Sequence, residues 1–297
     1  MNKIRVIINP VSGTVSKRNL PLFIKKIFET HSFQAEIICT QYPGHASELT
    51  REALDKGIKY IVAAGGDGTI NEVGKAMIHS TSVLGIIPIG SGNGLARDLG
   101  IPMNIKKAIE VIIKAQTITI DYCKANDYIF FCTCGVGFDA IVSEKFSEGK
   151  RRGSISYAKS AISEYLKFRP DIYEITLDDG TVVKEKAFLM TCANASQYGN
   201  NAYIAPSANI QDGLMDIVML APLHPLDVGP LTFQLFTRQI NHNQRFSHYR
   251  SQKVSIKRSQ SGPMHVDGEP LHAGTEIFIE TIPAGLHVIV PSKAKLM

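Results

Sequence analysis

The first 120 residues alternate short apolar segments with segments of helical periodicity, and this alternation restricts the fold more than any other feature of the chain. Short apolar strands that alternate with helices predict a parallel sheet with helices on both faces. The expected strands are residues 4–9, 35–40, 60–66 and 83–90, and the expected helices are residues 20–31, 45–57, 70–80 and 104–115. In such a fold, ligands bind in the loops at the carboxyl ends of the strands.

The second half of the chain has a different pattern, which begins after Asp121. Short segments rich in β-branched and aromatic residues are separated by turn residues, and only residues 154–168 and 224–238 have helical periodicity. This pattern predicts a mainly antiparallel β domain, with the domain boundary near residue 122. The expected strands are residues 128–137, 172–181, 182–195, 214–220, 253–259, 276–282 and 286–291.

The composition is that of an ordinary globular chain, with 297 residues, 44% hydrophobic residues and a formal charge of +5. No acidic residue occurs between Asp227 and Asp267, whereas six basic residues do: Arg238, Arg245, Arg250, Lys253, Lys257 and Arg258. This basic stretch is either a solvated face or a surface that meets anionic lipid or nucleic acid. The five cysteines have no metal-ligand spacing and are expected to be core residues of a cytoplasmic protein, because no signal peptide or membrane-spanning run is found.

Four loops of the first domain share one character and are expected at one edge of the sheet. They supply glycines, small hydroxyl groups and helix N-termini, which are the groups that bind phosphate. Their sequences are NPVSG (9–13), TQYPGHA (40–46), GGDGTINE (65–72) and IGSGNGLARDLG (89–100). Glycines at 65, 66 and 68 permit a positive φ or a close approach of another group. Thr69 and Glu72 have capping-box spacing, so the helix is expected to start at 68–69.

These motifs together resemble the diacylglycerol kinase catalytic family, which includes bacterial lipid kinases, sphingosine kinases and ceramide kinases. The resemblance is carried by NPVSG, GGDGT and GSGNGLARDLGI, and in the second half by CGVGFDA (134–140), QYGNNAYIAPSANIQDGLMDIVML (197–220) and HVDGEP (265–270). It implies an α/β ATP-binding domain at 1–122, completed by 284–297, and a β-sandwich lipid-substrate domain at 123–283. The implied reaction is ATP-dependent phosphorylation of a lipid hydroxyl in phospholipid or sphingolipid metabolism, with ATP and Mg²⁺ as cofactors.

The resemblance also implies roles for individual residues. Glu269 would be the catalytic base, although some relatives are argued to use the acid that matches Asp67. Asp139 and Arg97 would contact the lipid substrate, and a structural Mg²⁺ would be held by Asp212 with the carbonyls of Asn209 and Leu214. The ATP contacts would be Asn9, Pro10, Val11, Ser12, Gly13, Thr40, Gly65, Gly66, Asp67, Gly68, Thr69, Ile70, Asn71 and Ser91.

Two departures from the family pattern leave the acceptor open. Gly94 stands where bacterial diacylglycerol kinases often have an acid, and the resulting GSGN-type loop is more like that of sphingosine kinases. Asn200 and Asn201 interrupt a glycine triplet, and asparagine tolerates left-handed backbone better than most residues. The alternatives are a soluble-substrate kinase such as an NAD kinase, which shares GGDGT, and a non-catalytic nucleotide-responsive lipid-binding protein. The expected partners are a lipid and an anionic membrane surface, without nucleic acid; a homodimer is left open.

Overall fold

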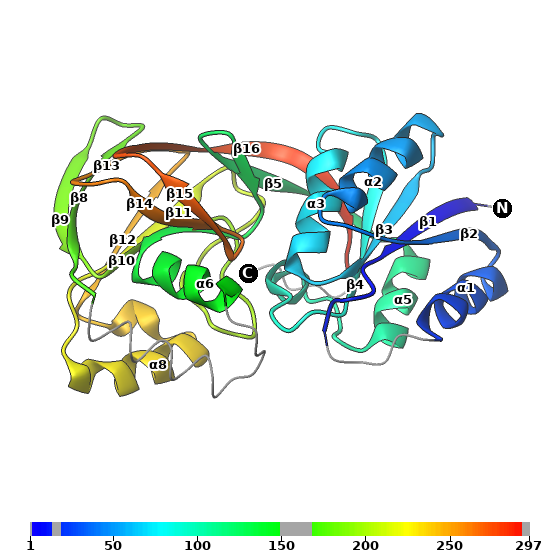
Figure 1. The fold of residues 1–297 in the computed structure, drawn as a ribbon, viewed down its shortest axis with the longest axis horizontal. Coiled ribbons are helices and arrows are strands. Elements are labelled where there is room, and N and C mark those ends of the chain that lie inside the picture. Colours follow the sequence, from blue (N-terminus) through cyan, green and yellow to red (C-terminus); the bar gives the residue numbers. More distant parts are fainter. Residues whose placement is uncertain (1, 14–18, 149–167, 293–297) are drawn as a thin grey trace. The chain divides into compact units, whose positions relative to one another are not determined.

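The computed structural model describes residues 2–13, 19–148 and 168–292, which belong to two compact units (Figure 1). Unit 1 comprises Met1–Asp121 and Pro283–Met297, and unit 2 comprises Tyr122–Ile282. The C-terminal segment therefore belongs to the same unit as the N-terminus. No helix in the described part of the chain is long and apolar enough to cross a membrane.

Unit 1 is built on a parallel sheet. The strands are β1 (Asn2–Ile8), β2 (Phe33–Cys39), β3 (Tyr60–Gly65) and β4 (Val83–Pro88), in the order β2-β1-β3-β4. Strands β1, β3 and β4 are mostly buried, and the edge strand β2 is largely accessible. The end of β16 (Glu276–Ile289) extends this sheet, because Val288 pairs in parallel with Leu84 of β4. All carboxyl ends of β1 to β4 therefore lie at one edge, as expected from the alternation in the sequence.

Helices cover both faces of this sheet (Figure 1). Helices α1 (Leu20–Thr30) and α5 (Ile105–Lys114) lie on one face, and α2 (His45–Asp55) and α3 (Asp67–Met77) lie on the other. On the first face, Ile24 and Ile112 pack against Val6 and Val62 in one apolar cluster. Burial of such side chains contributes about 1.5–3 kcal/mol each, so the apolar faces of the helices hold the layers together. A short helix, α4 (Gly94–Asp98), was not predicted and lies within the loop after β4.

Unit 2 contains two antiparallel sheets. One has the order β12-β11-β10-β7-β14-β15, and in the other the first half of β16 pairs with β13, which pairs with β8 and then β9. The hairpin of β5 (Thr117–Ala125) and β6 (Tyr128–Phe130) adjoins β16. The bounds of the sheet strands are β7 (Thr133–Gly137), β8 (Asp171–Leu177), β9 (Val182–Ala187), β10 (Leu189–Ala193), β11 (Met215–Leu220), β12 (Phe246–Ser251), β13 (Lys253–Arg258), β14 (Gly262–Val266) and β15 (Glu269–Ala273).

Side chains from both sheets of unit 2 meet in one apolar core. Met190, Met215 and Met264 come from the first sheet, and Ile175 and Val254 come from the second. Among the described residues of unit 2, the remaining elements are helices α6 (Phe138–Glu148) and α8 (Val228–Phe236) and the short 3-10 helices η1 (Pro225–Asp227) and η2 (Ile240–His242).

The structure confirms the expected fold class, an α/β domain followed by an antiparallel β-sandwich, and corrects several elements. The expected strands 276–282 and 286–291 are one continuous strand, β16, and the expected strand 182–195 is divided at Phe188 into β9 and β10. Strand β12 was missed because its sequence, FSHYRS, is largely polar. The expected helix at 154–168 lies, apart from its last residue, outside the described residues.

Candidate active site

Asp67 connects the two glycine-rich loops that follow β3 and β4. Its carboxylate accepts the N–H of Asn93 on Oδ2 at 2.8 Å and the N–H of Gly94 on Oδ1 at 2.6 Å. Both donors lie at the N-terminus of α4, where the backbone N–H groups have no partner within the helix. The carbonyl of Gly65 also accepts the N–H of Ile89 at 2.8 Å, so the loops are joined through backbone and side chain.

Close approach, and not backbone conformation, explains the glycines of these loops. A Cβ atom on Gly90 would lie 2.6 Å from the Cα of Gly66, and one on Gly92 would lie 2.7 Å from Oδ2 of Asp67. A Cβ on Gly65 would lie 2.5 Å from the side chain of Thr69. Gly65, Gly66 and Gly68 are not among the glycines with a positive φ, and Gly66 has φ −93°, so of the two alternatives that the sequence left open, the structure shows close approach at Gly65.

The loop after β1 joins the same group. Asn9 donates from Nδ2 to Oγ1 of Thr69 at 3.0 Å and accepts the N–H of Val11 on Oδ1 at 3.0 Å. Gly13 has φ +65°, and a Cβ there would lie 2.0 Å from the carbonyl oxygen of Ile89. The loops after β1, β3 and β4 are therefore in direct contact, as a phosphate site made from several loops requires.

The residues predicted to contact ATP differ in how far their side chains are exposed. The side chain of Val11 is 72% exposed, and Ser91 is exposed as well. In contrast, Thr69, Ile70 and Asn71 are almost completely buried. For Ile70 in particular, any contact with ATP would be through the backbone. Pro10 and Ser12 lie in the loop after β1, and the N–H of Thr40 continues the strand pairing by donating to Ile8.

Glu72 does not cap its own helix, so the capping-box interpretation is wrong. Helix α3 begins at Asp67, and Thr69 Oγ1 receives the hydrogen bond from Asn9. The carboxylate of Glu72 instead accepts the N–H groups of Gly44 at 3.0 Å and Ala46 at 3.2 Å. These groups lie at the N-terminus of α2, so Glu72 attaches the loop after β2 to α3.

In unit 2, Asp267 and Gly268 form the two-residue turn between β14 and β15, with φ +49° and +80°. An Asp-Gly pair is favoured at such hairpin turns because both positions need a positive φ. The carboxylate of Asp267 accepts three backbone N–H groups between β6 and β7, from Phe131, Cys132 and Thr133, at 2.9, 2.8 and 3.1 Å. This anchoring role was not predicted.

Glu269 follows the turn as the first residue of β15, in register with Val266, and it is exposed. The anchored turn thus holds a carboxylate at the start of a strand. A general base must be reachable and held in place, and the base role of Glu269 stays a prediction of the resemblance.

Asp139 lies in the first turn of α6 and is enclosed by side chains of unit 2. Its Oδ2 accepts hydrogen bonds from Thr191 Oγ1 at 2.8 Å and Tyr198 OH at 3.1 Å, and lies 3.2 Å from Nε2 of His265. Its Oδ1 accepts the N–H of Ala140, and only 10% of the side chain is exposed. A lipid head group at Asp139 would therefore compete with internal donors. The other predicted substrate residue, Arg97, donates from Nε to the carbonyl of Gly92 at 2.9 Å within unit 1.

The cysteines do not form a reactive site. Cys123, Cys132, Cys134 and Cys192 are buried, whereas Cys39 is exposed, which corrects the expectation for that residue. Burial raises the pKa of Cys134 well above its usual value and, with the charge of nearby Asp139, raises the pKa of Cys192 to about 12. Buried thiols of this kind are not nucleophiles at neutral pH.

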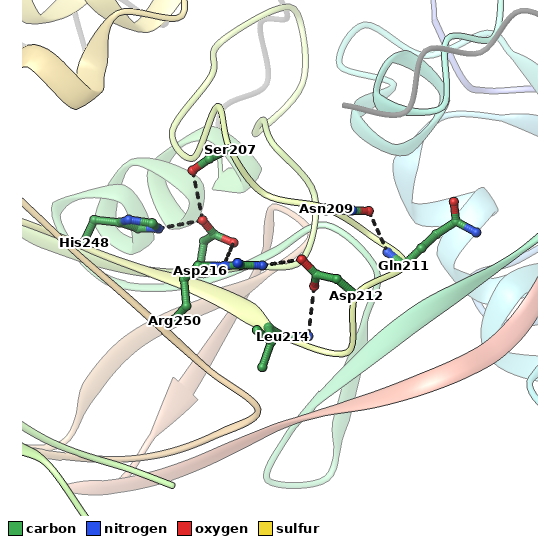
Figure 2. Close-up of polar contacts among 8 residues, drawn as sticks. All are labelled: Ser207, Asn209, Gln211, Asp212, Leu214, Asp216, His248 and Arg250. Atoms are coloured by element: carbon green, nitrogen blue, oxygen red, sulfur yellow. Dashed lines mark hydrogen bonds and ion pairs between the residues drawn. The ribbon is translucent and has the colours of Figure 1, made fainter. Parts of the chain in front are cut away.

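Figure 2 shows the segment where the resemblance implies a structural Mg²⁺. Asp212 Oδ1 accepts the N–H of Leu214 at 3.1 Å, and its Oδ2 pairs with the guanidinium of Arg250. Arg250 also reaches Asp216, with Nε 3.6 Å from Oδ2. Asn209 uses its side-chain oxygen to accept the N–H of Gln211 at 3.1 Å.

Arg250 of β12 already places a cation beside this segment. Asp216 is completely buried, and its Oδ1 receives Ser207 Oγ at 3.1 Å and lies 2.6 Å from Nε2 of His248. Arg250 therefore supplies a counter-charge to both acids, and no cluster of three or more metal-ligating side chains occurs among the described residues. A dication at Asp212 would compete with the guanidinium of Arg250 for the carboxylate. The residues do not fit a dedicated Mg²⁺ site as they stand, and we derive no step from a structural metal ion.

The interrupted glycine triplet keeps its turn. Gly199, Asn200 and Asn201 have φ of 116°, 49° and 64°, so both asparagines adopt the left-handed conformation that the sequence allowed. The side chain of Gln197 closes the turn by accepting the N–H of Asn201 at 3.1 Å.

Comparisons with known proteins show which family the chain belongs to. Residues 3–125 match the family description Diacylglycerol kinase catalytic domain, and residues 132–290 match YegS C-terminal NAD kinase beta sandwich-like domain. A diacylglycerol kinase of Bacillus subtilis is 29% identical over 276 residues, covering 91% of this chain and 90% of the relative. A Pseudomonas putida protein named probable lipid kinase YegS-like is 30% identical over 266 residues, covering 88% of this chain and 87% of the relative.

Solved structures show the same fold. A diacylglycerol kinase from Bacillus anthracis superposes with a TM-score of 0.78 at 22% identity, covering 99% of this chain and 98% of that chain. An NAD kinase from Archaeoglobus fulgidus in complex with ATP gives a TM-score of 0.55 at 14% identity, with 99% and 95% coverage.

Proposed function

Because the chain belongs to the diacylglycerol kinase catalytic family, we propose that it transfers the γ-phosphoryl group of ATP to a hydroxyl group of a lipid. The observation that supports this proposal most is that each unit has a loop or turn held in place by an aspartate side chain. Asp67 holds two glycine-rich loops together in unit 1, and Asp267 anchors the turn that presents Glu269 in unit 2. A protein that only bound lipid or nucleotide would not need an exposed carboxylate on an anchored turn.

The residues of unit 1 bind and orient the nucleotide in this proposal. Backbone N–H groups in the loops after β1, β3 and β4, together with the N-terminus of α3, hold the phosphates of ATP. The glycines let these loops pack closely, because a Cβ atom at Gly65, Gly90 or Gly92 would meet other atoms of the same loops. Mg²⁺ bound with ATP would supply neutralisation of the phosphate charge.

Glu269 accepts the proton of the attacking lipid hydroxyl. General base catalysis of this kind contributes about 10²–10⁴-fold to the rate, and positioning of the two substrates contributes the larger remainder. The acceptor is a diacylglycerol or a sphingoid-type alcohol, and the enzyme meets it at a membrane surface as a peripheral protein. In this proposal Arg97 supports the loop after β4 through the carbonyl of Gly92, and Asp139 holds Thr191 and Tyr198 within unit 2.

One alternative has an observation in its favour. The fold is similar to that of an NAD kinase that binds ATP, and GGDGT is shared with that class. Curated relatives that cover most of the chain are, however, named diacylglycerol kinase or lipid kinase, which favours a lipid acceptor.

A radiolabelled-ATP assay decides between the alternatives. The purified protein is incubated with diacylglycerol, sphingosine, ceramide, NAD and sugar phosphates, each separately, with Glu269→Gln as the matched inactive variant. We expect label in one lipid product, and a loss of that label with Glu269→Gln. Label in NADP would favour the NAD kinase function, and label in no acceptor would favour a non-catalytic lipid-binding protein.

A further inference from the structure

Helix α8 of unit 2 is apolar on two opposite sides. On one side Leu231 is buried and packs, with Leu235 beside it, in a cluster that includes Ile204 and Ile240. On the other side Phe233 is 62% exposed and Phe236 is 51% exposed. Side chains three or four positions apart lie on the same face of a helix, so these two pairs define opposite faces. Leu226 in the preceding η1 is 90% exposed and adds a third large apolar side chain.

The exposed side of α8 also presents few polar groups. Residues 228–237 contain no charged residue. Thr232 and Thr237 donate their hydroxyl groups to the carbonyls of Val228 and Phe233, at 2.7 and 2.8 Å. The hydroxyl hydrogen atoms are thereby bonded back to the helix. A helix that is apolar all round is normally buried on all sides, so the outer side of α8 calls for an apolar environment.

The charges around α8 are cationic. Arg238 follows the helix, is exposed and lies over the ring of Tyr203 at 4.1 Å. The only acid of the helix region, Asp227, pairs with Arg245 at 2.9 Å.

The rest of the basic stretch is compensated by acids from other segments. Arg250 pairs with Asp212, and Lys253 and Lys257 face Glu280 and Glu276 across the β13–β16 pair, each at 3.7 Å. The stretch as a whole is therefore not the continuous basic surface that the sequence suggested. What remains is an apolar helix followed by an exposed cationic residue, Arg238.

We propose that the exposed side of α8, with Leu226, Phe233 and Phe236 at its centre, inserts into the interface of an anionic lipid bilayer. An apolar helix face with basic residues at its border suits this location, because the side chains enter the acyl boundary while the cations meet the head groups. The inference rests on the proposed function, in which the acceptor is a lipid. A second copy of the chain suits the patch less well, since stable dimers bury about 800 Å² on each partner and three large side chains supply about half of that.

Vesicle binding by the full chain tests the proposal. Co-sedimentation with phosphatidylglycerol vesicles and with phosphatidylcholine vesicles is measured for the wild type, for Phe233→Ser with Phe236→Ser, and for Phe278→Ser. Phe278 is the matched control, because it is 45% exposed on β16 of the same unit. We expect the double variant to lose at least about tenfold in partitioning, and the control to lose less than about twofold.

Arg238→Gln separates the charge from the apolar contribution. It should weaken binding to the anionic vesicles about fivefold at low salt, and the loss should shrink at high salt. Equal binding by the wild type and the double variant, or no binding by the wild type, would overturn the proposal. Light scattering that shows a wild-type dimer and a monomeric double variant would overturn it in favour of a second copy.

The kinase assay with detergent-dispersed lipid distinguishes this inference from the proposed function. The double variant should keep its rate on dispersed lipid and lose rate only on vesicles, since α8 is not placed in the catalytic machinery. A wild type that binds vesicles through α8 but phosphorylates no lipid would contradict the proposed function and leave the inference intact. A wild type that phosphorylates dispersed lipid but binds vesicles equally with and without Phe233 and Phe236 would contradict the inference alone.

Discussion

Asp67 in unit 1 and Asp267 in unit 2 each precede a glycine, and each carboxylate holds the backbone of another loop. Asp67 accepts two N–H groups, from Asn93 and Gly94, and Asp267 accepts three. The two regions differ in the next acidic residue along the chain. After Asp267 it is exposed Glu269, whereas after Asp67 it is Glu72, which is engaged with the N-terminus of α2. In unit 2 the anchoring acid and the proposed base are two different residues; in unit 1 a single acid would have to serve as both. This difference favours Glu269 as the base.

The largest expected effect tests the assignment of the base to Glu269 directly. Glu269→Gln keeps the shape of the side chain and removes the base, so kcat should fall about 10²–10⁴-fold while ATP affinity is unchanged. The measurement is steady-state kinetics beside nucleotide titration on the folded variant. Glu276→Gln, an exposed glutamate of the same unit, is the control and should keep its rate. A Glu269→Gln enzyme with a near wild-type rate would make Asp67 the candidate base.

The second prediction compares the two anchors. Asp267→Ala leaves three N–H groups without their acceptor, and Asp67→Ala leaves two; we expect losses of about 4 and about 3 kcal/mol in local stability. Hydrogen exchange by mass spectrometry should show faster exchange at 131–133 in the first variant and at 93–94 in the second. Because the chain has two units, local exchange is a better measure than a single unfolding midpoint. Unchanged exchange at 131–133 would contradict the anchoring role of Asp267.

The third prediction concerns the glycines that let the loops of unit 1 meet. Gly90→Ala places a Cβ 2.6 Å from the backbone of Gly66, whereas Gly66→Ala places one 3.4 Å from Gly90. We expect Gly90→Ala to cost about 2 kcal/mol and to weaken ATP binding, and Gly66→Ala to cost less than about 1 kcal/mol. Thermal denaturation and ATP titration measure both. Gly274→Ala, which has open space around it, is the control. Equal effects at 66 and 90 would show that the loops rearrange.

The smallest effect concerns the counter-charge of Asp212. The wild type should show no stabilisation by millimolar Mg²⁺ in the absence of nucleotide, because Arg250 already pairs with the carboxylate. Arg250→Gln should lose about 1 kcal/mol and regain part of it when Mg²⁺ is added. Thermal denaturation with Mg²⁺ or a chelator measures this, with Lys253→Gln as the control. Mg²⁺ stabilisation of the wild type that Asp212→Ala removes would instead support the metal site that the resemblance implies.

Several features of the fold and the candidate site could be predicted from local sequence. Strands β1 to β4 and helices α1, α2, α3 and α5 were predictable because mostly apolar segments of 6–8 residues alternate with helical periodicity, and parallel strands then place their loops at one edge. The turn at Asn200 and Asn201 was predictable because asparagine tolerates left-handed backbone. The family resemblance indicated Glu269, but nothing in the local sequence showed that Asp267 anchors the turn in front of it.

Tertiary structure decided the features that depend on distant partners. Thr69 and Glu72 have the spacing of a capping box, yet Glu72 binds Gly44 and Ala46, because the packing of α2 on α3 brings those N–H groups within reach. The basic stretch has no acid of its own, and the register of β13 with β16 and of β11 with β12 supplies Glu276, Glu280 and Asp216 from other segments. Helical periodicity and turn preferences act over about four residues, whereas these partners are 19 or more positions apart. The sequence by itself determined the elements and the edge where the loops gather; sheet register and helix packing decided which charges are compensated and which side chains remain exposed.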